Sequence, residues 1–312
     1  MHIESQKLRG PRPKAALCAA AAVIAVFSST FAASAQSQTL DRIREQGAVR
    51  FGYIPEARPF TFNGDGSVDG YAAALCEQIA GHIKVQLRLQ SLRVEWVPVT
   101  MDNRLNKVAQ GDVDLLCTPT SITADRRQEA SFSVPIFAAG NRIVLRADAP
   151  AALRNALSDH PVSQPVWRGS PAAKVLQGTT IASVAGTTTE KWLAERRSAL
   201  QVDAKLVTVR DPKTGVQQLL DRQIDALVAD RTVVLSALDS ATRDKVIVLD
   251  RMLTHEPAAF AMARGDEDFR LVVDNTLSEL FASDLFPKLY QHWVGPYDES
   301  VHTFFSWNSL TR

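Results

Sequence analysis

The stretch GDVDLLCTPTSITADRR, residues 111–127, joins a predicted buried strand to a candidate anion site. VDLLC is a short apolar run of the kind that forms buried strands. Thr123 is a good N-cap, so we predict that a helix begins at Thr123 or Ala124. In its first turn the guanidinium of Arg126 could bind a carboxylate, with Ser121 just before it. A surface arginine and an ordinary cap explain the same residues equally well.

Strands and helices alternate on both sides of this stretch, which favours an α/β protein with mostly parallel sheets. We predict strands at 48–54, 92–99, 113–117, 141–146, 180–184, 205–209, 224–229, 246–249 and 259–264, and helices at 39–46, from 71, from 102 to 111, from 189, and at 216–220, 231–238, 266–282 and 285–293. Asp102 is the expected N-cap of the third helix. Residues 148–177 give no clear prediction.

The composition is that of a globular protein. The chain has 312 residues, 46% of them apolar and 22% charged, with 15 Gly and 15 Pro. This excludes collagen, low-complexity sequence and intrinsic disorder, and the length suggests about two domains. The formal net charge is +1, and no run of Lys or Arg follows the N-terminal segment. We therefore expect no nucleic-acid partner.

The N-terminal segment has the pattern of a secretory signal. Basic residues from Lys7 to Lys14 precede the apolar stretch AALCAAAAVIAVF at 15–27, and Ala33 and Ala35 follow. We predict a signal peptide at 1–35, cleaved after Ala35, and a periplasmic mature protein. An uncleaved anchor is the alternative, but the run is shorter than the roughly 20 residues that span a bilayer.

Two cysteines remain after cleavage, Cys76 and Cys117. Export to an oxidising compartment makes a disulfide between them one reading, and two buried free thiols are the other. No His has the spacing that a zinc site would need, so we expect no metal and no cofactor.

Two further positions could contact a ligand. After the strand at 180–184, Gly186 permits a tight turn, and Thr188 offers an amide and a hydroxyl at a helix start. Asp230 ends the strand at 224–229, where ligands bind in parallel sheets, and could pair with an ammonium. The alternatives are plain helix caps, by a threonine in the first case and by Asp230 itself in the second.

Enzyme signatures are missing from the sequence. It contains no G-x-G-x-x-G fingerprint, no Walker loop and no G-x-S-x-G elbow, and its histidines form no nucleophile–base pattern. We therefore expect no catalytic residues. The candidate sites suit a protein that holds a zwitterion without transforming it.

Several motifs follow one another along the chain: G-x-x-x-E-A-R-P-F from Gly52, G-Y-x-x-x-L-C from Gly70, GDVDLLC from Gly111, SITADRR followed by SFSVPIF, and AGTTTE at 185–190. In the order and spacing of these motifs the chain resembles the amino-acid-specific periplasmic solute-binding proteins of ABC importers (family 3). The segments VPVT at 97–100 and NR at 103–104 resemble the glutamate/aspartate-binding branch.

The resemblance implies a two-lobed, type II periplasmic-binding-protein fold. Each lobe would be a mixed sheet flanked by helices, and two hinge strands would join residues 36–143 plus 255–312 to residues 144–254. The ligand would be an amino acid, the partner an inner-membrane ABC permease, and the protein a monomer. The implied ligand contacts are Arg126 with Ser121 for the α-carboxylate, the amide of Thr188, Asp230 for the α-ammonium, Arg104, and Phe60 as a wall or a core residue.

The chain departs from the acidic-ligand members of that family. Ile54, Met101, Pro119 and Pro212 stand where those members carry Arg, Ser, Ser and His, which leaves a pocket less suited to an acidic side chain.

Two other functions share the scaffold. One is a cyclohexadienyl dehydratase-like enzyme, which would need a cleft carboxyl group as general acid. The other is a ligand sensor for a chemoreceptor.

Overall fold

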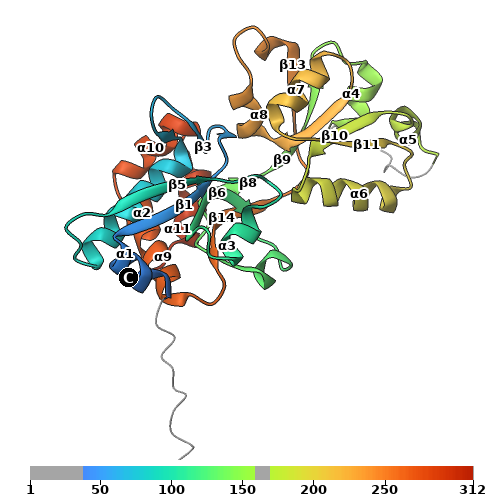
Figure 1. Ribbon diagram of the computed structural model, residues 1–312. Helices are drawn as coiled ribbons and strands as arrows, with labels where there is room; N and C mark the ends of the chain where they lie inside the picture. Colours follow the sequence, from blue (N-terminus) through green and yellow to red (C-terminus); the bar gives the residue numbers. More distant parts are fainter. Residues whose placement is uncertain (1–37, 159–168, 312) are drawn as a thin grey trace, which may run out of the picture. The chain divides into compact units, whose positions relative to one another are not determined.

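The computed structural model describes residues 38–158 and 169–311. The predicted signal peptide at 1–35 lies outside them. Two mixed β-sheets, each with helices on both faces, make up most of this part of the chain (Figure 1). None of the helices in these ranges combines the length and the apolar character that crossing a bilayer requires.

The first sheet is parallel on one side and antiparallel on the other. In spatial order its strands are β5 (Arg93–Pro98), β1 (Ala48–Tyr53), β6 (Leu115–Ser121), β14 (Glu256–Ala263) and β7 (Ala130–Phe132), with β8 (Phe137–Ala139) also pairing with β14. β5, β1 and β6 run parallel, whereas β14 is antiparallel to each neighbour. The prediction of mostly parallel sheets is therefore too simple, because β14 returns to this sheet from the other one.

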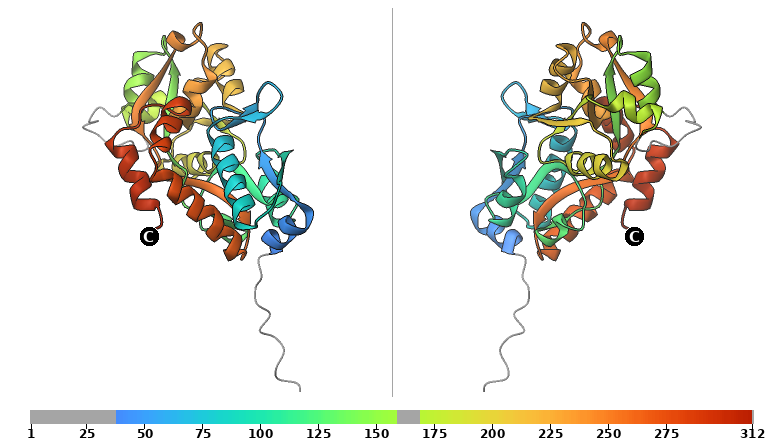
Figure 2. Two further views of the ribbon diagram at one scale, coloured as in Figure 1. Left: turned by 90° about the vertical axis from the view of Figure 1, so that its left-hand side faces the viewer. Right: turned by 90° about the vertical axis from the view of Figure 1, so that its right-hand side faces the viewer.

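Helices bury both faces of the first sheet. The larger core contains apolar residues of α1 (Gln38–Gln46), α2 (Tyr71–Gln86), α9 (Glu267–Phe281), α10 (Leu285–Trp293) and α11 (Glu299–Asn308). Figure 2 shows α2 and α9 side by side. The opposite face packs against α3 (Arg104–Ala109). A small hairpin sheet of β2 (Glu56–Ala57), β3 (Thr61–Asn63) and β4 (Val68–Asp69) precedes α2.

The second sheet repeats this layered arrangement. Its order is β11 (Lys205–Val209), β10 (Thr180–Val184), β12 (Ala226–Asp230), β9 (Asn141–Arg146) and β13 (Val246–Met252). Alternate residues of β9 serve the two faces: Ile143 and Leu145 join one core and Val144 the other. The helices of this half are α4 (Ala151–Leu157), α5 (Pro171–Leu176), α6 (Thr188–Leu200), α7 (Pro212–Leu220) and α8 (Arg231–Ala237), and η2 (Arg243–Lys245) is a short 3-10 turn.

The chain passes between the two sheets twice, from β8 to β9 and from β13 to β14. Hydrogen bonds tie the two connections together. The amide of Leu253 donates to the carbonyl oxygen of Asn141 at 2.8 Å, and Nδ2 of Asn141 donates to Oγ1 of Thr254 at 2.8 Å. The lobe boundaries at 143/144 and 254/255 stay predictions, and they fall next to these connections.

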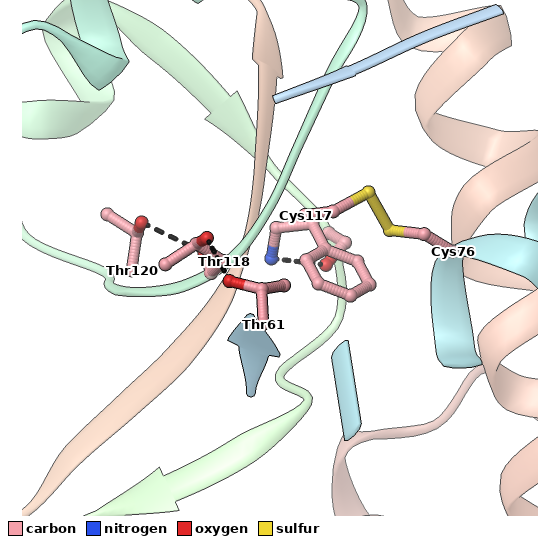
Figure 3. The surroundings of a disulfide bond; sticks show 7 residues. Thr61, Cys76, Cys117, Thr118 and Thr120 are labelled. Atoms are coloured by element: carbon pink, nitrogen blue, oxygen red, sulfur yellow. Dashed lines mark hydrogen bonds between the residues drawn. A yellow bond between two sulfur atoms is a disulfide. The ribbon is translucent and has the colours of Figure 1, made fainter. Parts of the chain in front are cut away.

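A disulfide joins Cys76 of α2 to Cys117 of β6 (Figure 3). The two Cα atoms are 6.2 Å apart, within the ordinary range for a disulfide. Just beyond Cys117, the hydroxyls of Thr61 and Thr118 lie 3.4 Å apart, and the hydroxyl of Thr120 donates to the carbonyl of Thr118 at 3.1 Å. The bond therefore fixes α2 to the strand that leads to Ser121.

One predicted cap is wrong. Helix α3 begins at Arg104, and Asn103 rather than Asp102 occupies the N-cap position. Oδ1 of Asn103 accepts from the amide of Thr100 at 2.9 Å, and the amide of Asn103 donates to Oγ1 of Thr100 at 3.3 Å. This local turn delays the helix, so Asp102 precedes the cap.

The predicted helix after Thr123 is also wrong. The structure has only a 3-10 turn there, η1 (Arg126–Gln128). Oγ1 of Thr123 accepts from the amide of Arg126 at 3.1 Å, as a cap would, but the chain enters β7 at Ala130 before a helix can extend. No helix dipole therefore supports the guanidinium of Arg126 at this point.

Candidate functional site

A cavity of about 210 Å³ is lined by residues of both sheets. All six residues that the sequence singled out lie on its wall: Phe60, Arg104, Ser121, Arg126, Thr188 and Asp230. They come from separate parts of the chain, so only the fold brings them together. Their roles toward a ligand remain proposals.

Arg126 projects from η1 into the cavity. Its Nη1 donates to the carbonyl oxygen of Ser121 at 2.9 Å, and its Nη2 lies 3.5 Å from the carbonyl oxygen of Gly186. Burial lowers the pKa of the guanidinium, and the carboxylates of Glu256 and Glu129 act in the opposite direction. The side chain is thus held at the end of β6, with its second nitrogen directed at the second sheet.

Arg104 approaches the same carbonyl group. Its side chain is almost completely buried, and its Nη2 lies 3.4 Å from the carbonyl oxygen of Gly186. Burial and the nearby charge of Arg126 lower the pKa of Arg104 to about 10. Two guanidinium groups therefore converge on one neutral acceptor, an arrangement that an anion would stabilise.

Thr188 is the first residue of α6, and the residues before it form the cap. The hydroxyl of Thr187 accepts from the amide of Glu190 at 3.4 Å, and Oε2 of Glu190 accepts from the amide of Gly186 at 2.9 Å. Gly186 has a φ of +69°, a conformation that favours glycine. Because Thr187 supplies the cap, the hydroxyl of Thr188 is left for another partner. It donates to Oε2 of Glu256 at 2.5 Å.

Asp230 caps α8 and also lines the cavity, so its role as a cap does not exclude a ligand contact. Its Oδ1 accepts from the amides of Thr232 at 2.8 Å and Val233 at 3.3 Å, and its Oδ2 accepts from the amide of Gly140 at 2.9 Å. Burial raises the pKa of this carboxyl group, and the three amides partly offset that effect. Within the described ranges, none of its hydrogen bonds comes from a basic side chain. A ligand ammonium would supply the missing countercharge.

Phe60 is both a wall and a core residue. Its side chain is buried, and its ring lies 4.9 Å from the ring of Phe137 and 6.4 Å from that of Tyr71, edge to face in each case. Phe60 also lines the cavity. The ring therefore gives the wall a rigid apolar surface.

The sequence analysis missed Glu256 and Asn141, which also line the cavity. Oε1 of Glu256 accepts from Nδ2 of Asn141 at 3.2 Å. No motif marks either residue. Each is the first residue of a strand, Asn141 of β9 and Glu256 of β14, and only the folded chain brings these two strand starts together. The sole hint in the sequence was a carboxylate next to the predicted hinge.

The remainder of the wall is largely apolar. The four residues that depart from the acidic-ligand pattern, Ile54, Met101, Pro119 and Pro212, all line the cavity. Arg58 also lines it, with its guanidinium 3.4 Å above the ring centroid of Phe62. Across residues 38–158 and 169–311, no group of three His, Cys, Asp or Glu side chains is placed to hold a metal ion. The arrangement places two guanidinium groups and the carboxylate of Asp230 beside a largely apolar surface.

Residues 49–296 match the family model of the bacterial extracellular solute-binding proteins, family 3. The chain belongs to this family. The L-glutamate/L-aspartate-binding protein of Pseudomonas aeruginosa is 25% identical over 280 residues, covering 89% of this chain and 86% of that protein. The L-cystine-binding protein of Escherichia coli is 24% identical over 283 residues, covering 90% of this chain and 95% of its own length.

Solved structures of family members share the fold. A mutant of ArgBP from T. maritima superimposes with a TM-score of 0.66 at 22% identity, covering 82% of this chain and 98% of that one. The ancestral amino acid-binding protein AncCDT-1, a precursor of cyclohexadienyl dehydratase, gives 0.65 at 25% identity, covering 82% and 99%. The predicted two-lobed type II periplasmic-binding-protein fold is confirmed.

Proposed function

We propose that this family 3 protein captures an amino acid, or a related small carboxylate, in the periplasm and delivers it to an inner-membrane ABC permease. The observation that carries the proposal is one cavity with two guanidinium groups at Gly186 and, at Asp230, a carboxylate whose hydrogen bonds within residues 38–158 and 169–311 come from backbone amides. Such a cavity complements the two charges of a zwitterion. The predicted signal peptide at 1–35 supports the periplasmic location.

In this proposal each charged residue has one task. The α-carboxylate binds Arg126 and the amide of Thr188, with Arg104 beside it. The α-ammonium binds Asp230, whose carboxylate is already oriented by three backbone amides. Because the contributing residues come from both sheets, a bound ligand would favour the conformation that holds them together, through a hinge at the two connections.

The ligand's side chain would lie against the apolar part of the wall. The relatives named above bind glutamate and aspartate in one case and cystine in another. Ile54, Met101, Pro119 and Pro212 offer neither charge nor hydrogen-bond donors from their side chains. We therefore propose a neutral amino acid as the preferred ligand.

A second candidate is an enzyme on the same scaffold. AncCDT-1 is described as a precursor of cyclohexadienyl dehydratase, and Glu256 is a carboxyl group inside the cavity that could serve as a general acid. Incubation with prephenate or arogenate separates the candidates, because only the enzyme releases an aromatic product.

A sensor that hands its ligand to a chemoreceptor would share the capture step with a transport protein. Pull-down with permease or receptor domains would separate the sensor from the transport protein.

A thermal-shift screen of the mature chain against the twenty amino acids tests the capture step. A ligand at a hundredfold excess over its Kd adds about 2.7 kcal/mol to the free energy of unfolding. We expect one or a few neutral amino acids to raise the melting temperature. If no amino acid and no related carboxylate did so, the proposed function would be wrong.

A further inference from the structure

The carboxylate of Glu256 is held inside the cavity by donors from two different elements. Asn141 of β9 donates to Oε1 at 3.2 Å, and Thr188 of α6 donates to Oε2 at 2.5 Å. Glu256 is the first residue of β14, so its backbone is also fixed by pairing with Ala139 of β8. Because two side chains and a strand pairing hold it, the carboxylate of Glu256 is an ordered part of the cavity wall.

The position of this charge matters because of its neighbours. Thr188 follows Gly186 by two residues, and Gly186 is where Arg104 and Arg126 converge. Glu256 is close enough to Arg126 for its negative charge to act on that guanidinium. Near Gly186 the two cationic side chains are therefore accompanied by the carboxylate of Glu256, and Asp102 also acts on Arg104.

Negative charges already oppose the two guanidinium groups at this end. Asp102 acts on Arg104, and Glu256 acts on Arg126. In the proposed function one ligand carboxylate binds the guanidinium groups, while the ligand ammonium binds Asp230. A second ligand carboxylate would add an unbalanced negative charge beside Glu256, in a partly buried site where like charges repel strongly.

We propose that Glu256 acts as a built-in second carboxylate, which makes the cavity select amino acids with one carboxylate over dicarboxylic ones. The inference rests on the proposed function and names the ligand class of the same site. Glu256 is a specificity-determining residue in this account: it occupies the donors and the positive charge that a ligand's second carboxylate would need.

The test compares L-glutamate with the best neutral amino acid by isothermal titration calorimetry, on wild type and E256Q. The substitution removes the charge but keeps an oxygen that can accept from Asn141. We expect wild type to prefer the neutral ligand by about tenfold or more, and E256Q to reduce that ratio by about tenfold, chiefly by tighter binding of glutamate.

E45Q is the matched control. Glu45 is exposed on α1 and does not line the cavity, so removing its charge should leave the ratio nearly unchanged. E256M, also neutral and of similar length, repeats the test if E256Q does not fold. Melting temperatures of all variants verify folding.

The results distinguish a failure of the proposed role of Glu256 from a failure of the proposed function. An unchanged ratio in a folded, ligand-binding E256Q overturns the inference and leaves the proposed function standing. Loss of all amino-acid binding in folded E256Q also overturns it, because Glu256 would then hold the ligand ammonium. If wild type binds no amino acid at all, the proposed function fails and the inference fails with it.

Discussion

At the scale of single residues, the contact that organises the site is a backbone carbonyl shared by two arginines. Nη2 of Arg104 and Nη2 of Arg126 lie 3.4 Å and 3.5 Å from the oxygen of Gly186. Both distances are long for such bonds, and a neutral carbonyl balances neither charge. A ligand carboxylate would form shorter, charge-assisted bonds with the same groups, and the affinity for it should depend on them.

Arg126→Ala should therefore weaken binding of the preferred amino acid by about 3 kcal/mol, because a partly buried carboxylate loses its countercharge. Titration calorimetry measures the effect. Arg127→Ala is the control, since the neighbouring side chain is exposed and does not line the cavity. Equal affinities of the two variants would show that the guanidinium of Arg126 does not contact the ligand.

The site residues differ in how visible they are in the sequence. Arg126 and Thr188 follow strands and Asp230 ends one, so local rules indicate all three. Glu256 could not be found in this way, because its neighbours Asn141 and Thr188 are distant in the sequence and meet it only in the folded chain. Asp230 shows a further limit of prediction from sequence. The sequence analysis treated a helix cap and a ligand contact as alternatives, whereas the structure allows both.

At the scale of secondary-structure elements, the disulfide is the strongest single link between α2 and β6. It closes a loop with a sequence separation of 41, and both cysteines are buried. The entropy of such a loop in the unfolded chain corresponds to a stabilisation of about 4 kcal/mol. The bond also supports Thr118 and Thr120, which line the cavity on the same strand.

Removing the disulfide should lower the free energy of unfolding by about 4 kcal/mol. Urea unfolding of wild type with and without reductant measures this difference. The double variant Cys76→Ala, Cys117→Ala should be unaffected by reductant. A wild-type midpoint that does not change after verified reduction of the bond would contradict the prediction.

Helix α9 carries a buried carboxyl group that makes stability depend on pH. Oδ1 of Asp274 accepts from the amide of Val134 at 2.7 Å, and Arg270 lies 3.7 Å from its Oδ2. Burial nevertheless raises the pKa of Asp274 from 3.8 to about 6. Because the folded state holds the proton more tightly than the unfolded state, this group lowers stability as pH rises between these values.

Asp274→Asn should therefore stabilise the protein at pH 8, on the order of 1 kcal/mol, and have little effect at pH 4. The amide oxygen of asparagine can still accept from Val134, so the substitution mainly removes the charge. Thermal unfolding of both proteins at both pH values measures the difference. A stabilisation that is equal at both pH values, or larger at pH 4, would disagree with the raised pKa.

Helices and strands that form through local interactions could be predicted from the sequence, whereas those that depend on contacts elsewhere in the fold could not. Strands such as β1, β9 and β10 were predicted from apolar runs, because each is buried on both faces. Helix α11 was missed; in the structure its Phe305 packs against Phe281 of α9 and against Phe286 and Tyr290 of α10. The turn at Arg126–Gln128 was mistaken for a helix because its cap is local, whereas its end is imposed by β7.

At the scale of the whole molecule, two chain connections carry the proposed motion. Both pass beside Asn141, which bonds to Leu253 and Thr254 of the other connection and to Glu256 in the cavity. The cavity and the connections therefore share a residue. A ligand that contacts residues from both sheets would be expected to shift the population toward conformations in which they approach.

Small-angle X-ray scattering should detect this shift as a smaller radius of gyration when the preferred amino acid is saturating. The reason is that ligand contacts from both sheets stabilise only the conformation that brings them together. Arg126→Ala at the same ligand concentration should show no change. A radius that stays constant under proven saturation of wild type would exclude a hinge closure.

The most direct test of the account is a crystal structure of the mature chain with its preferred amino acid. The account predicts density for the ligand in the cavity, with its carboxylate on the guanidinium of Arg126 and its ammonium on the carboxylate of Asp230. A ligand bound elsewhere, or bound in the cavity with neither residue in contact, would contradict it.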